Sequence, residues 1–527
     1  MSRLVSSSGR YLWAILLFGG VGLLILSPIG YLLSAAFTPG TMGAISAPAI
    51  LLLAGKSLSL AMFSTLWALI LALPLAWLVV RTDLPLRNVC RWIAVVPLAI
   101  PSYIGALTYV ALLGPVGIVN TGLGRLLDTQ TQWVNIYGYW GGVFVLGLFT
   151  YPYIFLLVAG ALETTNPAIE ETARSLGESP AGVLRRITLP MLRPSILAGA
   201  LLAFLYALSD FGSLSLLRVH VFTTEIYHQL NTRFDQAASS MLSFVLVLIT
   251  LAVLIGQRML LGRRSYVTVT GTSRLPRLVR LGRWRWAAYL VAAAIIGLSV
   301  LLPLAVLIVQ AGTVQHIHEV LQDQWKFFLN SLWTASLAAF LATVLGLLIS
   351  YTGNRLKGSV SSRFTGIVQM GYAIPGTVLG LSLILLYNTY LPWLYGTVAV
   401  VILAYLIRFL TQSLQGVEAA FAGINPHLEE AARSLSASPW VVLHRVVAPL
   451  LRPTLIAVGV LIFISSMKEL DATLLLRPPG FDTLPVRIYI HTVEAEYSTA
   501  ASLSLLLITL TALPWVMLAK LRNRKVL

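Results

Sequence analysis

Residues 166–194 read NPAIEETARSLGESPAGVLRRITLPMLRP, and residues 425–453 read NPHLEEAARSLSASPWVVLHRVVAPLLRP. The two segments lie 259 residues apart, align without a gap and are identical at 17 of 29 positions. Both are polar passages between apolar runs that differ much more from one half of the chain to the other. A polar surface that is kept in duplicate predicts that each copy docks against another molecule.

The composition around these segments indicates a membrane protein. Of the 527 residues, 57% are hydrophobic and only 10% are charged, and the mean hydropathy is +0.85. A soluble domain could not bury this much apolar surface. A spanning helix needs about 20 mostly apolar residues, and twelve such runs lie at about 12–37, 57–80, 93–113, 139–162, 195–217, 238–261, 287–309, 331–353, 364–386, 394–416, 454–476 and 498–519. Because the runs are continuous and do not alternate, we predict an all-α integral membrane protein.

The runs divide into two halves of six. We predict a first repeat at residues 1–261, a basic linker with Gly and Pro at 262–286, and a second repeat at 287–527. Because six is even, the second half enters the membrane in the same direction as the first. The expected architecture is therefore two parallel six-helix repeats related by an axis along the membrane normal.

The distribution of Lys and Arg predicts the orientation. With the amino terminus in the cytoplasm, 27 basic residues fall on the inner side and seven on the outer side. Both termini and both copies of the repeated segment are then cytoplasmic. The net charge of +17 is interpreted as a topology signal and a contact with anionic membrane lipids, and nucleic acid is not an expected partner.

Three short features are not expected to form sites. Cys90 is the single cysteine, so it can form no disulfide within the chain. Gly55-Lys56-Ser57 lacks the preceding glycine of a phosphate-binding loop, and the pair His316 and His318 lacks the spacing and carboxylates of a metal site. We therefore predict no bound cofactor and no firm metal site on this chain.

The repeated segment itself predicts a helix, a turn and a second helix at the cytoplasmic face. Asn-Pro starts each copy, and a pair of glutamates follows in the first turn, where the helix dipole favours negative charge. Ser-Pro breaks the first helix, and the second helix is expected to end near Pro190 and Pro449. The simpler alternative is a pair of amphipathic helices that rests under the bundle and binds nothing.

The spacing within each copy resembles a known signature. The first copy contains Glu171-Thr172-Ala173, then Gly177, then Ile187-Thr188-Leu189-Pro190. This pattern resembles the EAA signature of permease subunits of binding-protein-dependent ABC importers. The second copy keeps Glu430-Ala431-Ala432 and Pro449 but has Ser436 in place of glycine, and Val446 and Ala448 in place of Ile and Leu.

The resemblance implies a type I ABC-importer-like fold in a bacterial inner membrane. In that family the segment is a coupling helix that inserts into a cleft of a separate cytoplasmic ATPase subunit. It implies two ATPase copies that use the ATP, a periplasmic or extracellular substrate-binding protein, and no catalysis by this chain. The implied coupling residues are Glu170, Glu171, Ala173, Gly177 and Pro190 in the first copy, and Glu429, Glu430, Ala432, Ser436 and Pro449 in the second.

Further stretches resemble the fused, two-half permeases of iron(III) importers. They include Pro101-Ser102-Tyr103, Ser209-Asp210-Phe211-Gly212 and Lys468-Glu469-Leu470. The resemblance covers nearly the whole chain and implies iron(III) or a simple iron chelate as the cargo. Permeases for thiamine, polyamines and phosphonates are built similarly, so these cargoes remain alternatives.

Charged residues inside the predicted spans are candidates for the transport pathway. Asp210 lies in the fifth run, and Glu469, Lys468 and Asp471 lie in the eleventh. A charge within the bilayer costs on the order of 2.5–3.5 kcal/mol, so these side chains should face the bundle interior. Carboxylates, with the Tyr103 phenol, would offer oxygen ligands to a hard cation.

A structural role is the alternative for these charges. Lys468 would then pair with Asp471 or Asp210, and Arg408 of the tenth run would snorkel toward the cytoplasm.

The expected mechanism is alternating access, with the binding protein docked on outer loops 218–237 and 477–497. A secondary transporter would share the topology, although the loop after Arg81 lacks the glycines of its signature, and a membrane-embedded enzyme lacks a catalytic constellation.

Overall fold

The computed structural model describes residues 2–38, 41, 43–128, 131–164, 167–261, 278–356, 359–425, 427–434 and 438–523. Within these ranges the chain is helical apart from turns, loops and one isolated bridge between Thr82 and Val279. The predicted all-α class is confirmed.

The first half contains α1 (Ser2–Ala36), α2 (Ala47–Arg81), α3 (Arg87–Ile93), α4 (Ser102–Leu113), α5 (Ile118–Leu127), α6 (Tyr139–Thr164), α7 (Pro167–Ser175), α8 (Pro180–Val183), α9 (Leu189–Ser209), α10 (Gly212–Leu216), α11 (Phe222–Asn231) and α12 (Gln236–Leu261). The second half contains α13 (Arg285–Ile296), α14 (Leu302–Ala311), α15 (Val314–Asp323), α16 (Trp325–Leu356), α17 (Ser359–Ala373), α18 (Gly376–Tyr390), α19 (Val398–Phe421), α20 (His427–Ser434), α21 (Pro439–Val442), α22 (Ala448–Met467), α23 (Asp471–Leu476), α24 (Leu484–Val493) and α25 (Tyr497–Asn523). Short 3₁₀ turns lie at Val96–Leu98 and Gly282–Trp284, and π-helical turns at Leu184–Thr188, Gly297–Leu301 and Leu443–Val447.

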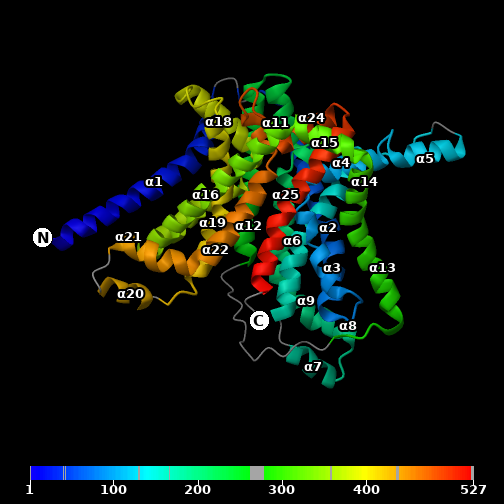
Figure 1. The fold of residues 1–527 in the computed structure, drawn as a ribbon, viewed down its shortest axis with the longest axis horizontal. Coiled ribbons are helices and arrows are strands. Elements are labelled where there is room, and N and C mark those ends of the chain that lie inside the picture. The colour runs from blue at the N-terminus through cyan, green and yellow to red at the C-terminus, as the bar shows by residue number, and fades with distance from the viewer. Residues whose placement is uncertain are drawn as a thin grey trace.

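Eleven helices of the described residues are long and apolar enough to cross a membrane, and the number is twelve if one bent pair counts as a single span. The bent pair is Phe364–Ala373 with Gly376–Tyr390, whose axes differ by 105°. Each of the twelve predicted runs overlaps one of these crossings. Figure 1 shows the long helices running between two ends of the molecule. α7 and α20 lie at one end, and α11, α18 and α24 lie at the other.

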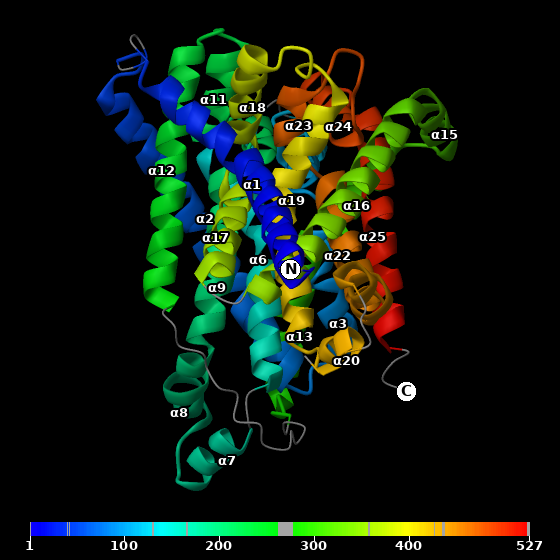
Figure 2. The ribbon, with the colours of Figure 1, turned by 90° about the vertical axis from the view of Figure 1, so that its left-hand side faces the viewer.

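The first helix of each half packs against the opposite half. α1 contacts α17 and α18, with the Phe18 and Phe364 rings 4.4 Å apart and the Tyr31 hydroxyl 2.9 Å from Thr389 Oγ1. Figure 2 shows α1 lying across the helices of the second half. In return, α13 and α14 contact α2 and α4, and Tyr109 donates to the carbonyl of Leu298 at 2.7 Å. This exchange joins the halves through one continuous apolar core.

Four predicted spans are interrupted, which corrects their boundaries. α9 stops at Ser209 and α22 at Met467, and the short helices α10 and α23 follow. α4 begins after Pro101 and α18 after Pro375, each proline standing just before the first helical residue. Proline lacks a backbone N–H and disfavours a helical residue before it, so the chain turns there. Hydropathy did not reveal the breaks because the residues on both sides are apolar.

The end predicted for the second helix of each repeated segment is wrong. Pro190 and Pro449 lie at the start of α9 and α22, and the helix continues through them into the membrane. A π-helical turn precedes each proline, at Leu184–Thr188 and Leu443–Val447. The wider turn accommodates a residue that cannot donate a hydrogen bond to the preceding turn, so the helix is not broken.

Most of the predicted linker, residues 262–277, lies outside the described residues. Its described end pairs with the loop after α2, where Val279 N donates to Arg81 O at 2.8 Å and Leu281 N donates to Asp83 Oδ1 at 2.9 Å. The start of the second half is therefore fixed to the end of the second span.

Candidate transport pathway and coupling surfaces

The interrupted helices meet at the boundary between the two halves. A Cβ atom added at Gly212 would lie 2.7 Å from Leu470 Cδ2 and 3.1 Å from Tyr103 Cβ. One added at Gly376 would lie 2.7 Å from Asp471 Cβ and 3.0 Å from Glu469 Oε1. Glycine at both positions allows the backbones to approach closely. We call the region around these breaks, with Ser102, Tyr103, Asp210, Arg408, Lys468, Glu469 and Asp471, the central cluster.

Asp210 is held by hydroxyl groups in the described structure. Its carboxylate accepts hydrogen bonds from the hydroxyls of Ser102 and Ser213 and from the backbone N–H of Ser213, the last at 3.1 Å. It is 7% exposed. Through Ser213 it caps α10, and through Ser102 it joins the break after α9 to the start of α4. The predicted pathway residue therefore connects two breaks of the first half.

Glu469 occupies the equivalent break of the second half but has a charged partner. It forms an ion pair with Arg408 of α19, and it accepts the backbone N–H of Ala472 at 3.2 Å. The expectation that Arg408 snorkels toward the cytoplasm is wrong. Its side chain is 15% exposed because a buried carboxylate lies within reach and offsets the cost of its burial.

Lys468 does not form the ion pair that the structural alternative gave it. Its ammonium group donates to the carbonyl of Leu98 at 2.6 Å, across the boundary between the halves. In the described residues, the ion pair found at this site is Arg408 with Glu469, and no contact of Lys468 with Asp471 or Asp210 is found. The carbonyl is available because Leu98 precedes the proline break, where regular helical hydrogen bonding is interrupted.

Tyrosines that the sequence analysis did not single out complete the central cluster. Tyr206 lies 3.0 Å from Ser102 Oγ, and its ring centroid is 5.8 Å from that of Tyr153. Tyr405 lies 2.7 Å from Thr473 Oγ1. The predicted Tyr103 is 4% exposed, and its hydroxyl has no hydrogen-bond partner in the described part of the chain. Phenols within apolar spans were the signal that could have identified this set.

The first repeated segment is anchored by a buried polar contact. Glu170 accepts from Thr188 Oγ1 at 3.0 Å and lies 3.4 Å from Arg81 Nη2 at the end of α2. Glu170 is 9% exposed, so it holds α7 against the bundle, whereas its neighbour Glu171 is exposed. Ala173 is half-buried, and Gly177 has a φ of +88°, which favours glycine at this turn after α7.

The second repeated segment is anchored by apolar packing. Val447 replaces Thr188 at the equivalent position and lies in a buried cluster with Val442 and Leu443, and Tyr351 donates to Pro439 O at 2.7 Å. Glu430 is exposed and lies 3.0 Å from His427 Nδ1, whereas Glu429 and Ala432 are half-buried. Ser436 lies outside the described residues.

Large apolar side chains are exposed on both segments. Ile169 and Leu176 are 45% and 82% exposed in the first copy, and Leu428 and Trp440 are 47% and 66% exposed in the second. Ile169 and Leu428 occupy equivalent positions. The same segments carry the exposed Glu171 and Glu430, so each segment presents both apolar and charged side chains, as surfaces that partners cover do.

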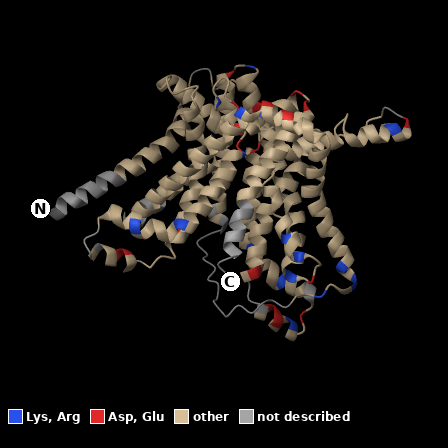
Figure 3. Cartoon of the chain, viewed as in Figure 1, with Lys and Arg blue, Asp and Glu red and all other residues tan. Residues whose placement is uncertain are grey.

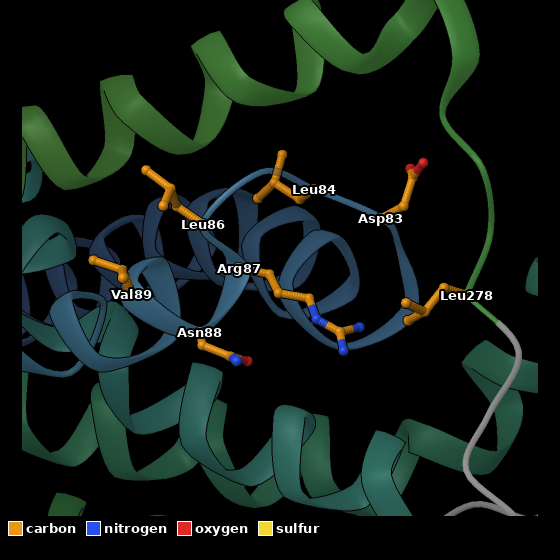
Figure 4. Close-up of a pocket in the computed structure, with 7 residues that line it drawn as sticks. All are labelled: Asp83, Leu84, Leu86, Arg87, Asn88, Val89 and Leu278. Carbon is orange, nitrogen blue, oxygen red and sulfur yellow. The ribbon is translucent and has the colours of Figure 1, made fainter.

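A separate cavity lies near the described end of the linker. It has a volume of about 460 Å³ and is lined by Asp83, Leu84, Leu86, Arg87, Asn88, Val89 and Leu278 (Figure 4). None of these residues belongs to the central cluster. The nearby Cys90 is buried and unpaired, and burial raises the pKa of its thiol.

The comparisons with known proteins identify the class. Residues 64–266 and 342–526 each match the family model for the inner membrane component of binding-protein-dependent transport systems. The chain is 26% identical over 429 residues to the Fe(3+)-transport system permease protein FbpB 2 of Haemophilus influenzae, a match that covers 80% of this chain and 81% of the relative. It is 30% identical over 423 residues to the putative ferric transport system permease protein FbpB 1 of the same species, a match that covers 75% of this chain and 65% of the relative.

A shorter relative matches only one half of the chain's length. The putative 2-aminoethylphosphonate transport system permease protein PhnV of Salmonella typhimurium is 27% identical over 253 residues, which is 46% of this chain and 96% of the relative. The family match removes the secondary transporter and the membrane-embedded enzyme as alternatives, because this family transports with ATP that a partner subunit hydrolyses. The chain belongs to the family of inner membrane components of binding-protein-dependent transport systems, as a multi-pass permease subunit of an ABC importer.

Proposed function

We propose that this permease moves iron(III), free or as a simple chelate, through the central cluster by alternating access. Two of the relatives are named as ferric or Fe(3+) transport permeases. The observation that carries the proposal is the meeting of four helix breaks around Asp210, Glu469 and Asp471. Broken helices at the boundary between repeats are a common place for transported ions and substrates.

The charge balance of the central cluster supports a cationic cargo. Its three carboxylates face two basic side chains, and both basic groups are already engaged, Arg408 by Glu469 and Lys468 by a backbone carbonyl. A phosphonate would need free cationic donors, whereas a hard metal cation needs oxygen ligands. The unpaired hydroxyl of Tyr103 adds one such oxygen.

The central cluster can also close the path. Asp210, Glu469 and Tyr103 are each less than 9% exposed, and Lys468 links the second-half break to the first half. Separation of the halves would break the contact between Lys468 and Leu98 and would expose the carboxylates. Alternating access needs this kind of contact, one that is made in one state and lost in the other.

The driving motion would enter through the repeated segments. We propose that one ATPase subunit docks on α7 and α8 and a second on α20 and α21, each covering the exposed apolar side chains described above. Because α8 and α21 continue without a break into α9 and α22, a displacement of either segment would move the helix that leads to Asp210 or to Glu469.

The proposed orientation places these segments and both termini in the cytoplasm. Figure 3 shows basic residues gathered at the end that carries α7 and α20. This distribution agrees with the excess of Lys and Arg in cytoplasmic loops of membrane proteins. The binding protein would then dock on the opposite end, around α11 and α24.

The decisive test is uptake of radiolabelled iron by the assembled importer. In the variants Asp210→Asn and Glu469→Gln, at matched expression, we expect the initial rate of uptake to fall at least about tenfold. A loss of this size corresponds to one or two ligand contacts of moderate strength. Asp323→Asn, an exposed carboxylate on α15, serves as the control and should leave uptake unchanged. Undiminished uptake in both cluster variants would leave these carboxylates a structural role only. Uptake of thiamine, a polyamine or 2-aminoethylphosphonate in place of iron would redirect the cargo assignment.

A further inference from the structure

The outer end of α24 turns back on itself and gathers three possible metal ligands. After Val493 the chain reverses through Ala495, whose φ of +63° lies in the left-handed region. The backbone N–H of Glu496 donates to His491 O at 2.8 Å, and Glu496 Oε2 lies 2.7 Å from His491 Nδ1. One ligand atom from each of His491, Glu494 and Glu496 lies within 4.8 Å of the others.

The chemistry of this set favours a transition-metal cation. One imidazole and two carboxylates suit iron or manganese among the first-row metals. The set lies at a helix carboxyl terminus, where the helix dipole favours positive charge. His491 is 6% exposed and turns its Nδ1 toward Glu496, whereas both glutamates are exposed. The site is therefore fixed on the protein side and open on the other.

The first half ends the equivalent helix in a similar reversal, which is one residue longer and lacks these ligands. α11 is the equivalent of α24, and the buried Gln229 stands where α24 has His491. Asp235 N donates to Gln229 O at 2.8 Å, and Phe234 has a φ of 56°, like Ala495. Because a reversal of this kind forms with glutamine at this helix position, the reversal does not depend on histidine. The His491 set is thus an addition to a structural element that both halves share.

The same helix touches the break of the first half. Tyr489, two residues before His491, lies 2.8 Å from Ser215 Oγ of α10. Its ring centroid is 5.8 Å from that of Phe211, the residue after Asp210. α24 therefore connects the outer turn with α10 and with Phe211, the residue beside Asp210 of the central cluster.

We propose that His491, Glu494 and Glu496 form an outer-face binding site for a first-row transition-metal cation, at which the cargo is held before it enters the central cluster. The assignment of the bound cation as cargo rests on the proposed function, whereas the site itself rests on the geometry. No covalent or redox step is involved.

The site is tested first by metal binding to the purified full chain. Mn(II) is the probe, and electron paramagnetic resonance measures the free ion. We expect the wild-type chain to bind Mn(II), and His491→Gln or Glu496→Gln to weaken binding at least about tenfold. His491→Gln copies the residue found at Gln229, so it should insert and fold normally. Asp323→Asn, an exposed carboxylate on α15 outside the proposed docking loops, is the control and should bind Mn(II) as the wild type does. Unchanged Mn(II) affinity in His491→Gln would overturn the site.

Uptake of radiolabelled iron then tests the role of the site. At limiting binding protein, we expect His491→Gln to lower the initial rate severalfold while the Asp323→Asn control keeps it. Lost Mn(II) binding with unchanged iron uptake would overturn the role as a holding site for the cargo. If the wild-type importer moves no iron while the variants still lose Mn(II) binding, the proposed function fails and the metal site stands.

Discussion

Arg408 of α19 and Glu469 of the break between α22 and α23 form a buried ion pair, with side chains 15% and 8% exposed. In the described structure of the first half, Asp210 forms no equivalent ion pair. The hydroxyls of Ser102 and Ser213 donate hydrogen bonds to its carboxylate instead. The two halves thus hold their broken helices by different chemistry. This asymmetry gives a direct experiment on each half.

Removing one partner of the ion pair should destabilise the bundle strongly. Arg408→Gln leaves Glu469 buried without its cation, which typically costs about 3–5 kcal/mol. We expect a lower thermal unfolding temperature of the purified protein in detergent. The double variant Arg408→Gln with Glu469→Gln removes both charges and should recover part of the loss. An Arg408→Gln protein as stable as the wild type would contradict the pairing.

The exposed glutamates of the repeated segments should respond to substitution differently from the buried Glu170. Glu171 and Glu430 are exposed, so Glu171→Lys and Glu430→Lys should weaken ATPase co-purification at least about tenfold through unfavourable charge at the interface, with membrane insertion intact. Glu170→Gln should lower the stability of the permease, because Arg81 loses its buried partner.

Co-purification with the ATPase separates these two roles. Insertion into the membrane is measured in parallel for every variant. Retained co-purification and normal transport in the double variant of Glu171 and Glu430 would refute the docking assignment. Unaltered stability in Glu170→Gln would refute the anchoring role.

Close packing at the central cluster predicts that a single methyl group is disruptive. Gly376→Ala places a Cβ 2.7 Å from Asp471 Cβ, and overpacking of this kind costs typically about 1–3 kcal/mol. We expect reduced stability and reduced iron uptake. Gly30→Ala in α1 has no heavy atom within 4 Å of the added Cβ and should behave as the wild type. Equal uptake by the two variants would show that the central cluster is looser than described.

The proposed orientation can be measured with single cysteines. In a Cys90→Ser background, Leu176→Cys and Val314→Cys introduce thiols at positions that are 82% and 83% exposed. A membrane-impermeant maleimide added to spheroplasts should label Val314→Cys and should reach Leu176→Cys only after lysis. Labelling of Leu176→Cys from outside would place the repeated segments on the wrong side for a cytoplasmic ATPase.

The local breaks in the helices were only partly predictable from sequence. The twelve runs and the duplication follow from composition and spacing, which are properties of the chain order. The breaks at Asp210 and Glu469 lie within runs whose average hydropathy remains high, so a hydropathy average does not reveal them. The π-helical turns before Pro190 and Pro449 depend on how a continuous helix accommodates a proline, and a proline alone indicates only that a turn or an end is near.

Partners of individual side chains were the least predictable feature. The structural alternative pairs Lys468 with a carboxylate, whereas Lys468 donates to Leu98 O, 370 positions away in the chain. The set at His491 was not found in the sequence, because the reversal at Ala495 brings Glu496 back onto the helix that precedes it. Sequence spacing gives no direct measure of such contacts.

By itself the sequence determined the membrane setting, the two repeated halves, the expected sidedness and the resemblance to importer permeases. These follow from hydrophobicity, loop charge and internal identity, which are read along the chain without knowledge of packing. Only the tertiary structure decided that Ser102 reaches Asp210 across 108 positions, that Arg408 neutralises Glu469, and that Glu170 anchors its segment inside the protein. The physical reason is that a polar group buried in a bilayer takes the nearest partner that helix packing brings to it, and packing depends on the whole fold.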